Sequence, residues 1–116
     1  MVCVDNDVCL RDFDVGFTIS VQVLRSPEDL SVVYTFVGDT DGMYVLETRL
    51  ARESIDTEYL GKHELLTYGD AIEYVMDRVK YTLTHVYSED AIGKDTIRRV
   101  EVKLKRLLEK VRKHMW

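Results

Sequence analysis

The chain has 116 residues, enough for one hydrophobic core and too few for two. Its 46% hydrophobic and 32% charged residues, with one proline, are typical of a compact globular domain and exclude a disordered chain. No stretch approaches the roughly 18 apolar residues of a membrane span, and the first residues lack the basic and apolar regions of a signal peptide. We therefore expect a single soluble domain over residues 1–116, with no membrane partner.

Charge is divided unevenly along the chain. Residues 94–116 contain nine Lys or Arg and three acidic residues. Residues 1–93 contain seven Lys or Arg and eighteen acidic residues. This separation favours recognition of an acidic partner, or of the protein's own acidic surface.

Residues 1–14 are acidic, and we expect them to be frayed at the end of the chain. This segment contains both cysteines, Cys3 and Cys9. Because a single pair makes no disulfide framework, we interpret them as free thiols, with a short disulfide loop as the alternative. Free thiols indicate a reducing compartment, and the predicted location is the cytoplasm.

Three strands are predicted within residues 15–50. Residues 15–25 alternate between apolar and polar, residues 31–37 are β-branched or aromatic, and residues 43–50 follow a glycine-containing hairpin loop. Short connections make these strands an antiparallel meander. Residues 51–68 show no clear period and are predicted to be a loop or a short fourth strand at the sheet edge.

Two amphipathic helices follow, at residues 69–87 and 95–115, with Thr67 or Asp70 placed to cap the first. Each has an apolar stripe at helical spacing. The stripes are Ile72, Val75, Met76, Val79, Leu83 and Val86, then Ile97, Val100, Leu104, Leu107, Leu108, Val111 and Met115. The predicted fold is therefore α+β, a three-stranded or four-stranded antiparallel meander with both helices on one face.

Two helix faces are the candidate sites. The first helix carries a second stripe of residue types that are enriched at interfaces, which packs either against the same chain or against a partner: Tyr74, Arg78, Tyr81 and His85. The second helix carries a row of cations that suits phosphates, an acidic partner, or the chain's own acidic surface: Arg99, Lys103, Arg106, Lys110 and Lys113.

No catalytic or metal site is predicted. Asp39-x-Asp41-Gly42 lacks the further oxygen ligands of a calcium loop, and His63-Glu64 lacks the second histidine of a zinc-protease helix. No phosphate loop or nucleophile motif is present, and we expect no cofactor.

The run from Val32 to Leu83 contains a strand, the turn Gly-Asp-Thr-Asp-Gly, a Tyr-Val-Leu strand and a helix opening with Thr-Tyr-Gly-Asp. This order resembles the partial RNase H-like domain of HicB-type antitoxins over less than half of the chain, although the Pro-Gly-Cys before the third strand is missing. The resemblance implies a protein that binds and blocks a partner through its acidic surface. We assign no family from it.

The sequence thus predicts a small non-enzymatic protein that acts through surfaces rather than a pocket. We expect a homodimer that contacts a protein partner. The alternative is a nucleic-acid-binding protein that uses the basic face of the second helix, which the net charge of −5 disfavours because a polyanion repels an acidic body.

Overall fold

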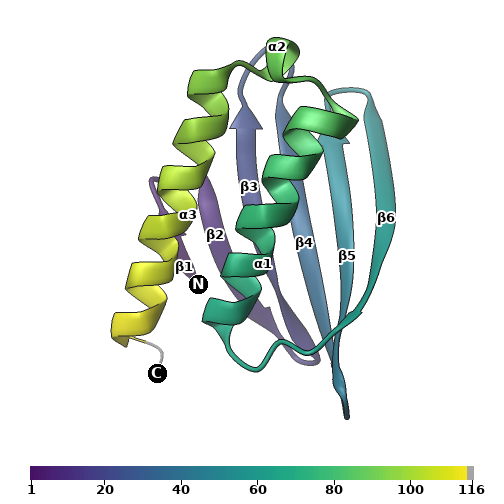
Figure 1. Ribbon diagram of the computed structural model, residues 1–116, viewed down its shortest axis with the longest axis vertical. Helices are drawn as coiled ribbons and strands as arrows, with labels where there is room; N and C mark the ends of the chain where they lie inside the picture. The colour runs from purple at the N-terminus through teal and green to yellow at the C-terminus, as the bar shows by residue number, and fades with distance from the viewer. Residues whose placement is uncertain (115–116) are drawn as a thin grey trace.

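The computed structural model describes residues 1–114 and is built on one six-stranded antiparallel sheet with its strands in sequence order (Figure 1). The prediction of three or four strands is therefore wrong, although the domain is still α+β. The strands are β1 (Val2–Val4), β2 (Val8–Phe13), β3 (Gly16–Leu24), β4 (Leu30–Asp39), β5 (Gly42–Ala51) and β6 (Ser54–His63).

The acidic N-terminus is not frayed but forms the first hairpin of the sheet. Asp5 and Asn6 in the β1–β2 turn both have positive φ angles, 52° and 60°. This backbone conformation matches the twist of a tight hairpin, and Asp and Asn adopt it more readily than most residues. Val4 and Val8 flank the turn and are buried in the core, so apolar burial holds the hairpin in place despite its aspartates.

Cys3 and Cys9 lie directly opposite each other in this hairpin and form a disulfide. The expectation of two free thiols is therefore wrong, and the argument from free thiols to a cytoplasmic location is lost with it. Because side chains alternate along a strand, the disulfide lies on the sheet face opposite Val4 and Val8, away from the core.

The region predicted as a loop or a short edge strand is a full strand of ten residues, β6, paired with β5. The side chains of residues 54–59 are all exposed. They show no period because neither side of this part of the strand faces the core. The pairing with β5 is interrupted near Gly61, whose φ of 92° is a conformation that favours glycine.

Two long helices cover one face of the sheet, with α3 over the N-terminal strands and α1 over the middle ones (Figure 1). They correspond in position to the predicted helices at residues 69–87 and 95–115; Met115 lies outside the described residues. The helical elements are α1 (Tyr68–Tyr81), the single π-helical turn η1 (Thr82–Val86), the short α2 (Glu89–Ile92) and α3 (Lys94–His114).

Helix α1 begins with a reciprocal cap between the two residues considered for that role. The Thr67 hydroxyl accepts a hydrogen bond from the Asp70 amide at 3.1 Å, and the Asp70 carboxylate accepts one from the Thr67 amide at 3.2 Å. Two amides that the helix cannot satisfy are thereby paired. This cap fixes where the chain turns from the sheet end into the helix.

The core lies between the helices and the sheet face that they cover. Residues on the predicted apolar stripes are buried there, including Ile72, Val75, Val79 and Leu83 from α1 and η1, and Val100, Leu104, Leu107 and Val111 from α3. The sheet contributes Leu10, Ile19, Val21, Val32, Tyr34 and Phe36. Among residues 1–114, no helix combines the length and the apolar character needed to cross a membrane.

Truncation of the buried helix stripes should strongly destabilise the protein. Leu83 and Leu104 are both fully buried, so Leu83→Ala or Leu104→Ala should lower the free energy of unfolding by about 2–5 kcal/mol. Val102→Ala, at a residue 41% exposed on α3, is the control and should change it by less than about 0.5 kcal/mol. Urea unfolding measures all three. Equal effects of Leu104→Ala and Val102→Ala would contradict this packing of α3.

The disulfide should contribute to stability by restricting the unfolded chain. The double change Cys3→Ser and Cys9→Ser should lower the free energy of unfolding by about 2 kcal/mol, the value expected for closing a short loop. Dithiothreitol should destabilise the wild type similarly and leave the double variant unchanged. Identical unfolding curves for oxidised and reduced wild type would show that the cross-link does not form in solution.

Candidate functional site

Tyr74 and Arg78, the first two residues of the predicted interface stripe on α1, pack against the sheet of their own chain. The ring of Tyr74 packs edge-on against Phe36 at 6.5 Å between centroids and lies 4.6 Å from the ring of His63. Arg78 points toward the sheet, where its Nε lies 3.3 Å from a carboxylate oxygen of Glu47. Both side chains therefore help to hold α1 on the sheet.

The other two residues of that stripe remain on the surface. Tyr81 is 49% exposed, and its ring stacks on that of His85 at 4.6 Å. The guanidinium of Arg78 lies 5.0 Å from the Tyr81 ring on its other flank. The stripe thus presents one small aromatic surface, Tyr81 and His85, rather than four residues.

The predicted basic face of α3 lies beside the N-terminal hairpin. Lys103 forms an ion pair with Asp7, and Arg106 lies 3.6 Å from Asp5. Lys110 donates a hydrogen bond of 2.8 Å to the backbone carbonyl of Cys3. Three of the five predicted cations therefore contact the acidic segment of the same chain.

The remaining two cations of that face, Arg99 and Lys113, are exposed. They lie near opposite ends of α3, about 14 residues or 20 Å apart along the helix. The row of cations predicted from helical spacing is thus partly paired within the chain, because Lys103 and Arg106 face acids of the hairpin. The hydrogen bond of Lys110 goes to a neutral carbonyl and leaves its charge unbalanced.

A buried ionic cluster that the sequence analysis missed lies under the end of α1. Glu47 on β5 is 0% exposed. One carboxylate oxygen accepts hydrogen bonds from the hydroxyls of Tyr34 (2.5 Å) and Thr82 (2.7 Å), and the other accepts one from Arg49 (2.5 Å). Arg78 adds longer hydrogen bonds to both oxygens. A single carboxylate therefore joins β4, β5, α1 and η1.

Hydrogen bonding keeps this buried carboxylate ionised. Burial acts to raise the pKa of Glu47, but hydrogen bonds from Tyr34, Arg78 and Thr82 outweigh it and lower the pKa below its usual value of 4.5. Burial and the neighbouring Glu47 charge raise the pKa of the Tyr34 hydroxyl, which therefore remains a neutral donor. The cluster carries a stable negative charge that two arginines balance.

The cluster continues to the edge strand. Arg49 pairs with Asp56 at 2.9 Å and with Glu58 at 3.1 Å, both on β6, and Arg78 reaches Glu58 at 3.3 Å. These ion pairs connect β6 to β5 and α1, so we assign the cluster a structural role.

Substitution of Glu47 should be among the most damaging single changes. Glu47→Gln leaves Arg49 and Arg78 without their buried counter-charge, and should lower the free energy of unfolding by about 3–5 kcal/mol near pH 7. Glu58→Gln, at a half-exposed side chain of the same cluster, is the control and should cost less than about 1 kcal/mol.

The effect of Glu47 should also depend on pH with a defined sign. Its pKa is lower in the folded than in the unfolded protein, so its contribution is complete above pH 4.5 and is lost as the pH falls below 4.5. Denaturant unfolding at several pH values should show wild type and Glu47→Gln converging on acidification. A constant difference down to the acid-unfolded state would contradict this linkage.

The sheet face away from the helices, which we call the open face, is almost free of charge on its central strands. The strand register places neighbouring open-face side chains in rows across β3, β4 and β5, and nearly all are half-buried. Apart from Asp39 at the end of β4, they are uncharged: Thr18, Ser20, Gln22, Ser31, Val33, Thr35, Val37, Tyr44, Leu46, Thr48 and Leu50.

Strand β5 has charged residues on its buried side and apolar residues on its outward side, the reverse of the usual arrangement. Its core side carries Glu47 and Arg49, whereas its open side carries Tyr44, Leu46 and Leu50. On β6 the open face continues with two strongly exposed apolar residues, Ile55 (75%) opposite Leu50 and Tyr59 (58%) opposite Leu46. The apolar alternation in residues 43–50 indicates a strand with one apolar side. The buried cluster determines that this side faces away from the helices.

Within residues 1–114, no three His, Cys, Asp or Glu side chains are grouped so that they could hold a metal ion. Comparisons of the chain with protein-family models, with curated proteins and with solved structures found no match. The resemblance of residues 32–83 to HicB-type antitoxins rests on the sequence pattern alone.

Proposed function

We propose that this protein is a non-enzymatic interaction protein that forms a homodimer through the open face of its sheet. The observation that carries the proposal is the composition of this face. In a chain with 32% charged residues, the central three strands present only one there, Asp39 at the end of β4. Depletion of charge is the feature that distinguishes the centre of protein interfaces from ordinary surface.

The reversed sides of β5 support the same conclusion. Burying Glu47 and Arg49 while leaving Leu46 and Leu50 facing outward costs hydrophobic free energy that a second layer on the open face would recover. Two sheets that pack face to face lie about 10 Å apart, and side chains of this size from the two sheets interdigitate. Ile55 and Tyr59 would extend such a layer at the β6 edge.

A second copy of the chain is an occupant that the uncharged centre of this face can accept. The protein is acidic, with a net charge of −5, so most pairs of its surfaces repel each other. The charged residues of the open face, Arg11, Asp39 and Lys62, lie on β2 and near the ends of β4 and β6. The centres of two open faces can therefore meet without opposing like charges, and a twofold axis makes the same patch serve both subunits. Six strands at about 4.8 Å spacing give a face of roughly 600 Å² per subunit, somewhat below the area of a typical stable interface.

The alternative, nucleic-acid binding by α3, has less support. The middle of its basic face contacts the chain's own acidic hairpin through Lys103, Arg106 and Lys110. Phosphates would have to compete with those contacts and with the acidic remainder of the surface.

Sedimentation equilibrium at micromolar to submillimolar concentration tests the dimer. The wild type should approach twice the 13.5 kDa mass of the chain. Leu46→Glu should give monomers, because it places a charge in the apolar face that each subunit buries, and Tyr59→Ser should weaken association by about tenfold. Val102→Glu, on the exposed side of α3, is the matched control and should leave the dimer intact.

Two outcomes would overturn this interface. The first is a monomeric wild type across the whole range. The second is a dimer that survives both open-face changes but is lost in Tyr81→Ser, which would move the contact to the aromatic surface of α1. Because Tyr59 is an exposed edge residue, Tyr59→Ser keeps the test valid if Leu46→Glu fails to fold.

A further inference from the structure

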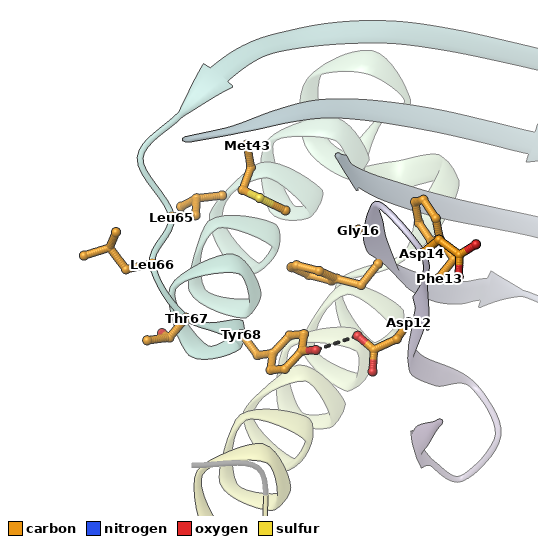
Figure 2. A pocket seen from close by; sticks show the side chains of 10 residues that line it. Asp12, Phe13, Asp14, Gly16, Met43, Leu65, Leu66, Thr67 and Tyr68 are labelled. Atoms are coloured by element: carbon orange, nitrogen blue, oxygen red, sulfur yellow. Dashed lines mark hydrogen bonds between the residues drawn. The ribbon is translucent and has the colours of Figure 1, made fainter. Parts of the chain in front are cut away.

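A groove of about 640 Å³ lies at the end of the sheet where α1 begins (Figure 2). The end of β2 and the turn after it form one wall, and the start of β5 and the segment between β6 and α1 form the other. We call it the acidic groove and define it by the residues that carry the argument: Asp12, Phe13, Asp14, Met43, Leu65 and Leu66.

The walls of the acidic groove combine apolar and anionic character. Leu66 is 82% exposed and Phe13 is 41% exposed, so both present apolar surface to the solvent. Asp12 is held in place by a hydrogen bond of 2.6 Å from the Tyr68 hydroxyl, whereas Asp14 lies exposed on the same wall (Figure 2). No lysine or arginine of the described chain lines this groove.

The anionic character continues past Leu65 and Leu66 into a neighbouring hollow of about 470 Å³. That hollow adds Asp39, Asp41 and Glu64 to its rim. Lys62 lies close to the first two, at 2.9 Å from Asp39 and 3.6 Å from Asp41, so it balances only part of this charge.

Three other hollows on the surface differ in this respect, because each is lined by at least one lysine or arginine. Anionic walls beside the exposed Leu66 are therefore a local property of this end of the sheet and do not simply follow from the acidic composition. A ligand complementary to it has positive charge next to apolar surface.

We propose that the acidic groove binds a short segment of another protein in which a lysine or arginine lies beside a bulky apolar side chain. The cation pairs with Asp14 and Asp12 at the β2 end, and the apolar side chain packs on Leu66, Leu65 and Met43. Long cationic side chains suit such a site because their methylene stems cover apolar surface while the charged end reaches a carboxylate. This site is separate from the dimer interface and does not depend on it.

The probe is a fluorescent amidated pentapeptide, Lys-Leu-Trp-Leu-Lys, titrated by anisotropy and by amide chemical shifts. Asp14→Asn should weaken its binding by about threefold, as expected for an exposed ion pair, and Leu66→Ser by about tenfold, as expected for loss of an apolar contact. Asp90→Asn and Val102→Ser, on α2 and α3, are the matched controls and should bind like the wild type. The chemical shifts of Phe13, Met43 and Leu66 should move.

Two further peptides separate the contributions. Glu-Leu-Trp-Leu-Glu removes the positive charge and Lys-Ser-Ser-Ser-Lys removes the apolar surface, and both should bind much more weakly. Equal binding of either one, shifts confined to other parts of the molecule, or no binding of the first peptide would overturn the proposal. Peptide binding should be unchanged in Tyr59→Ser, so this test stands apart from that of the dimer.

Discussion

The buried carboxylate of Glu47 is the contact on which the arrangement of this molecule depends. It receives hydrogen bonds from the neighbouring strand β4, from α1 and from the π-helical turn that follows α1. A shift of β5 by one residue would leave Arg78 and Thr82 without their acceptor and turn every β5 side chain to the other face. The same carboxylate therefore sets the register of β5 and causes Leu46 and Leu50 to face outward.

The elements with one buried side were predictable, and the others were not. β3 and both long helices place apolar residues at the spacing of a strand or a helix because each packs one side on the core. β6 has no such side, so its sequence carries no period. The N-terminal hairpin did carry a signal, since Val-Cys-Val and Val-Cys-Leu flank Asp-Asn-Asp. The acidic turn and the assumption of a frayed terminus obscured it.

The candidate surfaces were predictable only in part, for a related reason. Helical spacing placed the cations of α3 on one face, but the partners Asp5 and Asp7 lie about 100 residues away in the sequence. Pairing over that distance depends on the hairpin being part of the sheet. In the same way, Tyr74 and Arg78 lie where the helix spacing put them, yet they contact the sheet because β5 presents a buried acid to α1.

The interruption of β6 near Gly61 has a consequence for how copies of this chain could assemble. An exposed edge strand is a template for another strand, and repeated edge pairing produces open-ended fibres. A break in the ladder, together with the charges of Asp56 and Glu58 along this edge, shortens the segment that such pairing could use. Growth of a filament along this edge is therefore discouraged, whereas the open face of the sheet is unaffected by the break.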